Sequence, residues 1–297
     1  MTKSIVAIGV FDGVHYGHQA LTDKAVLQAA ATNTRAVALS FSPHPMTVVR
    51  GMKVPALTSL LRRTQLLRAT GIDHVHICDF SAARAAQTPA EFIQEVLIQN
   101  LGATEVVVGK GFRFGKGASG TIADFREAGL IAHEVGQVEL NGARVSSTRI
   151  REAITNGDIS AANTLLTRPH RYQGIVVGGL KRGRELGYPT ANLKPEFEQA
   201  VPADGVYAGW LATLSPSEEI IQQWPAAISV GTNPTFTDVP ERVVEAYALD
   251  ETDLDLYGQL VAVDFVERIR PMLAFNSIDE LIQAMNNDVS RAREILG

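Results

Sequence analysis

The stretch SIVAIGVFDGVHYGHQ (residues 4–19) decides the fold of the first half of the chain. It holds a short apolar run, a break at Phe11-Asp12-Gly13 and the start of a helical pattern. The segments that follow, GHQALTDKAVLQAAA and RAVALSF, repeat the change between helix and β-branched strand. Such alternation predicts a parallel sheet. We therefore expect an open, doubly wound α/β domain.

Further segments of the first half fit this domain. LTSLLRRTQLLRATGIDHVHICDF gives a helix followed by a strand, and TEVVVG gives another strand. Thr88 and Glu91 have the spacing of a capping box, with Pro89 at the first helical position. Apolar residues then recur at helical spacing before Gly102, which is expected to end this helix: Phe92, Ile93, Val96, Leu97 and Leu101.

The second half has a different pattern. Its strand candidates are closely spaced and separated by turn residues, which predicts a small antiparallel β-barrel: YQGIVVGG, DGVYAGWLATL, AAISVG, VVEAYALD and LVAVDFVERI. A last helix begins with a second capping box, Ser277 and Glu280, and its apolar stripe predicts packing on the barrel: Ile278, Leu281, Ile282, Met285 and Val289. The boundary is expected near Arg168-Pro169, which gives domains of residues 1–168 and 169–297.

The composition argues against several classes of protein. The chain has 297 residues, 45% of them hydrophobic, and its net charge of −5 argues against an electrostatic nucleic-acid binder. Its one cysteine, Cys78, forms no internal disulfide, which fits a reducing compartment. The apolar run before Asp12 is too short for a signal peptide or a membrane span, and no later segment approaches a span. We expect a cytoplasmic protein with no membrane or nucleic-acid partner.

The turn after the first strand is the first candidate site. Gly13 and Gly17 let the backbone approach a ligand where the N–H groups of a helix start point outward, so the turn is suited to an anion. His15 and His18 lie on this helix start. Taken alone, they fit polar cap residues as well as phosphate ligands. Zinc is the weaker reading, because no third ligand stands at ligand spacing nearby.

Three other segments favour phosphate. SFSPHP brings His44 after a second strand, and ligands of open α/β sheets bind beyond the carboxyl ends of strands. VVVGKGFRFGKGASG adds a basic, glycine-rich loop after a third strand. VSSTRIREAI supplies hydroxyls at a helix start, with Arg149 in its first turn. A cation at that end opposes the helix dipole, and a bound phosphate would explain it.

A second candidate site lies in the barrel half, in GGLKRGRELGYPTAN (residues 178–192). Its cations and glycines can cover phosphates, although an exposed basic hairpin would look the same. Thr190 and Asn192 offer two neutral oxygens on one side of an extended chain, which suits Mg²⁺ when nucleotide phosphates complete its coordination. Glu245, in the middle of the strand VVEAYALD, is the candidate general base.

Motif by motif, the chain resembles the prokaryotic bifunctional riboflavin kinase/FMN adenylyltransferases, also called FAD synthetases. GVFDGVHYGHQ, SFSPHP, VVGKGFRFGKGASG and RVSSTRIREA are similar to the adenylyltransferase half, and H-x-x-G-H also marks the wider nucleotidyltransferase superfamily. G-R-x-L-G-x-P-T-A-N, PADGVYAGW, AAISVGTNPTF, VEAYALD and DLYG are similar to the riboflavin kinase module. The resemblance covers nearly the whole chain. It implies a Rossmann-like nucleotidyltransferase domain followed by a riboflavin kinase β-barrel with a C-terminal helix.

The resemblance also implies an activity and residue roles. The activity would be phosphorylation of riboflavin to FMN and adenylylation of FMN to FAD, with ATP and flavins as substrates and Mg²⁺ as cofactor. Glu245, His15 and His18 would be catalytic, and Thr190 and Asn192 would hold the metal. The residues implied to bind nucleotide and phosphate are Gly9, Phe11, Asp12, Gly13, Gly17, His44, Ser146, Ser147, Thr148, Arg149, Lys181, Gly183 and Arg184. The oligomeric state is left open.

Two positions depart from the family pattern. Gly111 stands where Asp or Asn is usual, and Ser42 stands where Asp or Glu is usual. Losing an acceptor to a buried partner costs about 1–3 kcal/mol, although water can replace it. Two alternative hypotheses therefore stay open at this point: a riboflavin kinase with a weak or inactive adenylyltransferase half, and a non-catalytic flavin-binding regulator.

Overall fold

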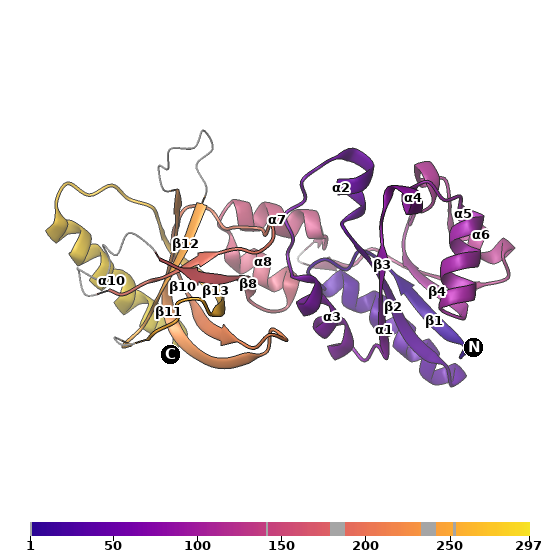
Figure 1. Cartoon of the computed structure of the whole chain (residues 1–297), viewed down its shortest axis with the longest axis horizontal. Coiled ribbons are helices and arrows are strands. Elements are labelled where there is room, and N and C mark those ends of the chain that lie inside the picture. Colours follow the sequence, from indigo (N-terminus) through magenta and orange to yellow (C-terminus); the bar gives the residue numbers. More distant parts are fainter. Residues whose placement is uncertain (1, 141, 179–187, 233–241, 252–253) are drawn as a thin grey trace. The chain divides into compact units, whose positions relative to one another are not determined.

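A computed structural model of the chain describes residues 2–140, 142–178, 188–232, 242–251 and 254–297 (Figure 1). The chain divides into two compact units, Met1–Val54 with Ser59–Ser147 and Pro55–Thr58 with Thr148–Gly297. The helices α7 (Ser147–Thr155) and α8 (Ile159–Leu166) therefore lie with the second unit, apart from the first residue of α7. The domain boundary expected near Arg168-Pro169 stays a prediction.

The first unit is built on a sheet of five parallel strands in the order β3-β2-β1-β4-β5. The strands are β1 (Ser4–Ile8), β2 (Arg35–Ser42), β3 (His74–Asp79), β4 (Ala103–Gly109) and β5 (Ile131–Val135). The helices are α1 (Tyr16–Thr32), α2 (Pro45–Arg50), α3 (Leu60–Ala69), α4 (Ala82–Ala85), α5 (Pro89–Phe92), the π-helix η1 (Ile93–Asn100), the short η2 (Lys116–Ala118) and α6 (Ile122–Glu127), and a hairpin pairs β6 (Glu139–Leu140) with β7 (Ala143–Arg144).

Helices cover both faces of this sheet, so the expectation of a doubly wound domain is confirmed. Side chains alternate along each strand, and β1 sends Ile5 and Ala7 to one face and Val6 and Ile8 to the other. The first face packs against α1 and α3, and the second against α5, η1 and α6. Figure 1 shows these helices on opposite sides of the strands. Burial on both faces explains the nearly continuous apolar runs of the sequence.

The predicted capping box at the start of α5 is present. The backbone N–H of Thr88 donates to the Glu91 carboxylate at 2.8 Å, and the N–H of Glu91 donates to the Thr88 hydroxyl at 3.2 Å. The apolar residues that follow are buried against the sheet, as their spacing predicted, although they continue as a π-helix.

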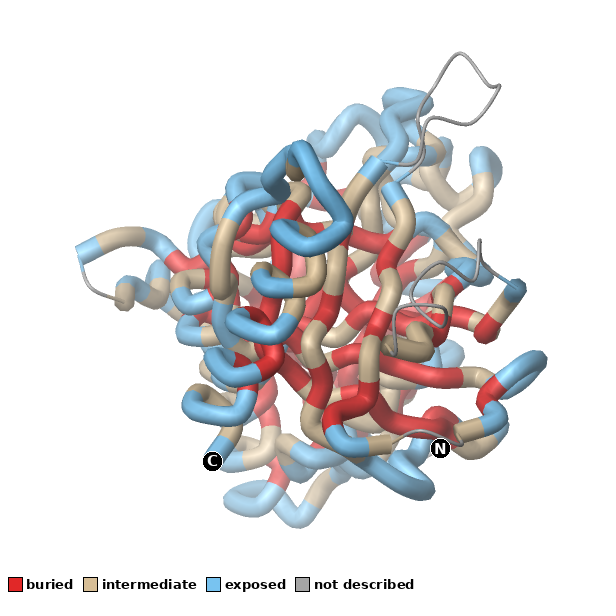
Figure 2. Tube along the Cα trace, turned by 90° about the vertical axis from the view of Figure 1, so that its left-hand side faces the viewer, coloured by how far each residue is buried: buried red, intermediate tan, exposed pale blue. Residues whose placement is uncertain are grey.

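The second unit is a closed barrel with the strand order β10-β11-β12-β9-β8-β13, in which every neighbouring pair is antiparallel. The strands are β8 (His170–Val177), β9 (Ala191–Lys194), β10 (Gly205–Leu214), β11 (Ile220–Thr232), β12 (Arg242–Ala248) and β13 (Leu260–Pro271). Buried and partly exposed residues alternate along β9, β12 and the second half of β11, whereas β10 is buried at nearly every position; Figure 2 shows burial along the chain. The predicted barrel is confirmed. No separate strand was predicted at β9, although Thr190 and Asn192 were expected to lie on an extended chain.

The C-terminal helix α10 (Ile278–Leu296) packs on the barrel as predicted, but mainly through its second half. Val289 and Ala292 are buried there, and the predicted stripe is at least partly buried from Leu281 onward, whereas its first residue, Ile278, is 65% exposed. An ion pair between Arg270 of β13 and Asp288 fixes the buried half at 2.6 Å. The capping box is also incomplete, because the Glu280 carboxylate accepts from the N–H of residue 276 instead of Ser277.

Candidate active sites

The turn between β1 and α1 is strained and tightly packed. Phe11, Gly13 and Val14 have positive φ angles of 55°, 87° and 38°, which are unusual for the two residues with side chains. Phe11 is fully buried, and its ring meets the edge of the His18 ring with the centroids 5.2 Å apart. The backbone therefore turns sharply at the carboxyl end of β1 and leads directly into the histidines.

The two histidines stack at the start of α1. Their ring centroids lie 3.6 Å apart at an interplanar angle of 14°. His15 is the N-cap, and its Nδ1 accepts the backbone N–H of His18 at 3.2 Å. Because Nδ1 is an acceptor, the neutral ring carries its proton on Nε2. The structure thus holds both rings in a defined orientation at a helix N-terminus, which favours anions.

The glycines of this motif make room for neighbouring rings. A Cβ atom at Gly17 would lie 3.3 Å from ring atoms of His15, and one at Gly9 would lie 3.2 Å from the Phe11 ring. Both positions are therefore restricted by packing. Gly13 instead supplies the positive φ of the turn.

Two other predicted segments of this site begin helices. His44 is the N-cap of α2, directly after β2, and its Nδ1 accepts the N–H of Met46 at 3.2 Å. Ser147, the first residue of α7, donates its hydroxyl to the backbone oxygen of Asp12 at 2.9 Å. Ser146 precedes that helix, and Thr148 and Arg149 occupy its first turn. Within the first unit, the SFSPHP segment and Ser147 thus lie at the carboxyl edge of the sheet, where the β1–α1 turn begins.

Asp12 faces inward, which the sequence did not reveal. It is 2% exposed, and its carboxylate lies 3.4 Å from the guanidinium of Arg63 on α3. Sequence reasoning missed Arg63. A signal was available, because Arg63 lies one helical turn before Leu67 on the apolar face of an amphipathic helix.

The two departures from the family pattern lie in accessible places. Gly111 has a φ of 74°, and its N–H donates to the Glu134 carboxylate at 2.9 Å. A Cβ atom there would meet nothing within 4 Å. Ser42 is the last residue of β2 and is partly exposed. Gly111 therefore has room for a side chain or for water, and Ser42 is within reach of solvent.

In the barrel, β9 and β12 bring the predicted residues of the second site together. Asn192 and Glu245 are direct partners in the antiparallel register, on the outer face of the barrel. The Thr190 hydroxyl donates to the Glu245 carboxylate at 3.4 Å. Burial raises the pKa of the Glu245 carboxyl above its ordinary value, and the hydrogen bond from Thr190 opposes part of the rise.

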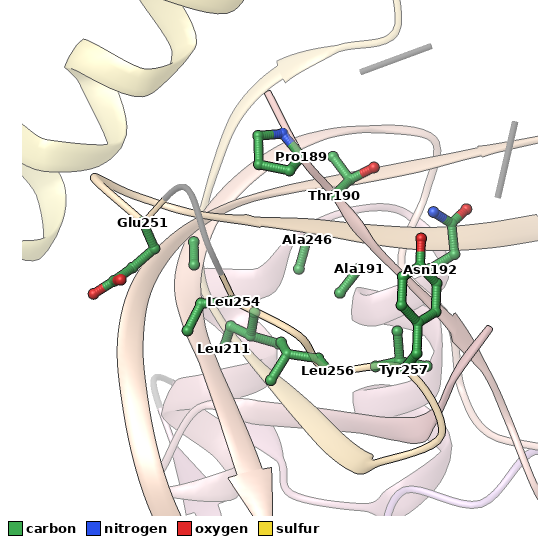
Figure 3. A pocket seen from close by; sticks show the side chains of 12 residues that line it. Pro189, Thr190, Ala191, Asn192, Leu211, Ala246, Glu251, Leu254, Leu256 and Tyr257 are labelled. Atoms are coloured by element: carbon green, nitrogen blue, oxygen red, sulfur yellow. The ribbon is translucent and has the colours of Figure 1, made fainter. Parts of the chain in front are cut away.

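A pocket opens beside this cluster (Figure 3). Thr190 and Asn192 form part of its wall, with Leu211, Leu254 and Leu256 supplying apolar surface. The pocket therefore combines apolar surface with polar side chains at its wall. Lys181, Gly183 and Arg184 lie outside the described residues.

The turn that carries Thr190 is tied to the C-terminal helix. The Tyr188 hydroxyl donates to the side-chain oxygen of Asn286 on α10 at 2.5 Å. The Tyr188 ring meets the edge of the Tyr247 ring with a centroid distance of 5.2 Å, and Tyr247 follows Glu245 by two positions on the same face of β12. This connection was not predicted from the sequence.

Structural metal sites bind the ion through protein ligands alone. Among the residues that the structure describes, no group of three or more histidine, cysteine or acidic side chains is arranged to hold a metal ion. The zinc reading of His15 and His18 therefore gains no support.

Comparisons with known proteins give the same division of the chain. Residues 1–149 match the FAD synthetase family, and residues 166–296 match the riboflavin kinase family. A bifunctional riboflavin kinase/FMN adenylyltransferase of Escherichia coli (strain K12) is 33% identical over 99% of this chain and 93% of its own length. The protein of the same description from Bacillus subtilis (strain 168) is 31% identical over 98% of this chain and 92% of its own.

A solved structure has the same fold over nearly the full length. The crystal structure titled as a macrolide-efflux protein from Streptococcus pneumoniae has a TM-score of 0.88 and 33% identity, and the match covers 98% of this chain and 94% of that one. In the described ranges of the present chain, no helix is long and apolar enough to cross a membrane. By its sequence relatives and its paired family matches, the chain belongs to the bifunctional riboflavin kinase/FMN adenylyltransferase family.

Proposed function

We propose that the two activities of this family are divided between the two halves of the chain, with Glu245 as the general base of the barrel and His15 and His18 as the phosphate ligands of the α/β half. As a family member, the chain is a transferase that converts riboflavin and ATP to FMN and ADP, and FMN and ATP to FAD and pyrophosphate. The observation that carries the residue assignment is the direct pairing of Glu245 with Asn192, beside Thr190.

In the kinase step, the riboflavin 5′-hydroxyl oxygen attacks the γ-phosphorus of ATP. The bond from that phosphorus to the bridging oxygen breaks, ADP leaves, and the hydroxyl proton passes to Glu245. A carboxylate suits this task when its pKa is raised toward the working pH, and burial acts on the Glu245 pKa in this direction. The apolar side of the neighbouring pocket would bind the flavin ring.

Mg²⁺ belongs to this proposal. The donor set fits the ion, since the Thr190 hydroxyl and the Asn192 amide oxygen are hard ligands on one face of β9 and the turn before it. Two neutral oxygens are too few for a complete shell, so ATP phosphates would supply the rest. When bound, the ion would neutralise charge on the transferred phosphoryl group.

In the adenylyltransferase step, an FMN phosphate oxygen attacks the α-phosphorus of ATP, and pyrophosphate leaves. Alignment and charge neutralisation are the main requirements when one anion attacks another. His15, His18 and the N-terminus of α1 would provide them, and no acidic residue occupies the first turn of that helix. The residues proposed to complete this site are Gly9, Phe11, Asp12, Gly13, Gly17, His44, Ser146, Ser147, Thr148 and Arg149, while Lys181, Gly183 and Arg184 are proposed for the kinase loop.

A chromatographic assay of the full chain tests these assignments. Riboflavin, ATP and Mg²⁺ should yield FMN and then FAD, and FMN with ATP should yield FAD directly. Glu245→Gln should remove only the first product step, and His18→Ala only the second. FMN without FAD from the parent chain would favour the alternative of an idle adenylyltransferase half. Flavin binding without ATP consumption would favour the regulator, which the comparisons do not support.

The domain limits and the location are part of the same proposal. Residues 1–168 would carry the adenylyltransferase and residues 169–297 the kinase, in agreement with the two family matches. The cytoplasm supplies ATP and the reducing conditions that suit the lone Cys78.

A further inference from the structure

Arg63 occupies an unusual place for a cation. It belongs to α3, outside all the motifs of the adenylyltransferase half, yet it is 8% exposed. A buried guanidinium is stable only when acceptors surround it. The acceptors that it uses therefore show which parts of the fold depend on it.

The guanidinium joins the ends of two neighbouring strands. Its Nη1 donates to the backbone oxygen of Val10 at 3.2 Å, just beyond β1, and to that of Phe41 at 3.2 Å, near the end of β2. It also reaches the hydroxyl of Ser40 at 3.4 Å, and this hydroxyl donates to the oxygen of Val10 at 2.8 Å. One cation thus satisfies carbonyl groups on both strands.

The same guanidinium holds the turn that follows β1. Its Nη2 lies 3.4 Å from the buried carboxylate of Asp12. Asp12 is part of the strained turn that ends at His15, and its backbone oxygen accepts the hydroxyl of Ser147. A shift of Asp12 would move both the histidine motif and the start of α7.

We propose that Arg63 is a positioning residue for adenylyl transfer, which fixes the histidine turn after β1 relative to the SFSPHP segment after β2. The residues at these strand ends are the proposed ligands of ATP and FMN, so this inference rests on the proposed function. Reaction between two bound anions depends on alignment, and an error of about 1 Å can lower the rate about 100-fold.

The test uses the full chain and follows both reactions. Arg63→Met should lower the kcat for FAD formation from FMN about 100-fold, with a smaller change in the KM for ATP. Riboflavin phosphorylation by the same preparation should stay within about twofold of the parent. Arg63→Lys keeps the positive charge but has fewer hydrogen-bond donors. Its kcat for FAD formation should be at least about tenfold higher than that of Arg63→Met. Arg68→Met, an exposed arginine of the same helix, is the matched control and should leave both rates unchanged.

A variant without either charge separates positioning from folding. Arg63→Met leaves the Asp12 carboxylate buried without its partner cation, which could unfold the α/β unit. Asp12→Asn with Arg63→Met removes both charges and should fold, but it should stay about as slow as the single variant because the strand ends lack their common donor. All rates are measured below the unfolding temperature of each variant and are divided by the concentration of folded protein.

The outcomes distinguish failure of the positioning role of Arg63 from failure of the proposed adenylyltransferase site. Parental FAD formation by the folded double variant would overturn the positioning role, since Arg63 would then only balance Asp12. Equal losses for Arg63→Lys and Arg63→Met would also overturn it. Full FAD formation by His18→Ala would instead refute the proposed site itself, whatever the Arg63 variants do.

Discussion

Replacing Glu245 by glutamine keeps the shape of the side chain and removes its capacity to take up a proton. The strand register keeps residue 245 opposite Asn192, and an amide oxygen can still accept from Thr190. The substitution therefore tests the proposed chemistry with little change in geometry.

General base catalysis typically contributes about 10²–10⁴-fold, so E245Q should lower the kcat of FMN formation by that factor. The change corresponds to about 2.7–5.4 kcal/mol of transition-state stabilisation. The KM for riboflavin should change little, because Glu245 lies outside the residues that line the pocket.

The pH dependence of the parent has a defined sign. A base acts only when deprotonated, so FMN formation should fall as the pH falls through the pKa of Glu245. Burial raises this pKa, and the acid limb should therefore lie above the ordinary value of 4.5. The residual FMN formation by E245Q should not show this fall in rate at acid pH.

Stability should change in the opposite direction to activity. The pKa of this carboxyl group is higher in the folded state than in the unfolded state. The group therefore stabilises the fold at pH values below its unfolded-state pKa, and this contribution is lost as the pH rises through its folded-state pKa. At neutral pH, E245Q should therefore unfold at a higher temperature than the parent. The difference should vanish below the ordinary pKa of 4.5.

The assay is chromatographic separation of riboflavin, FMN and FAD, with thermal unfolding followed in parallel. Glu219→Gln, an exposed glutamate of the same barrel, is the matched control. FAD formation from supplied FMN measures the other half of the chain and should not change. FMN formation by folded E245Q within about tenfold of the parent would refute Glu245 as the base.

Three further variants test the remaining sites. His18→Ala should lower FAD formation at least about 100-fold and leave FMN formation intact, and an equal loss of both would contradict the division of labour. Gly111→Asn should strengthen nucleotide binding in the adenylyltransferase reaction by about 1–3 kcal/mol, because asparagine tolerates positive φ and the space is open; an unchanged KM would show that water already fills this role. Asn286→Ala removes the acceptor of the Tyr188 hydroxyl and should raise the kinase KM for Mg-ATP about 2- to 10-fold, whereas Asn287→Ala on the exposed face should not.

The fold could be predicted because its signals are local and repeated. Apolar runs separated by helical patterns require a parallel sheet, and short strands with turns between them require a barrel. β9 was not predicted as a strand because its four residues are too few for a clear alternating pattern, and pairing with β12 and β8 defines it. In α10, helical spacing placed Ile278 in the apolar stripe, but spacing alone does not show where contact with the barrel begins, and this first residue is exposed.

For the candidate sites, the sequence suggests residues but not their geometry. The motifs single out His15, His18, Thr190, Asn192 and Glu245 as candidates, but do not show that His15 stacks on His18 or that Asn192 pairs with Glu245. The stacking depends on the backbone geometry at the start of α1, and the pairing depends on the register between β9 and β12.

Supporting residues were harder to find. Arg63 lies outside every motif, and its importance comes from carbonyl groups that belong to distant segments. Asp12 seemed available to a ligand, but its carboxylate is turned toward that buried cation. The sequence alone does not show the direction in which a side chain points.

The register between β9 and β12 also links activity to the folding process. A slip of one residue would place Asn192 opposite Val244 or Ala246 and turn its side chain to the other face. The barrel must therefore close in its native register before the proposed metal ligand and the proposed base can meet. During refolding, the first appearance of FMN should coincide with barrel closure, while FAD made from added FMN should report the maturation of the parallel sheet. The time courses of the two products should therefore measure the folding of the two units separately.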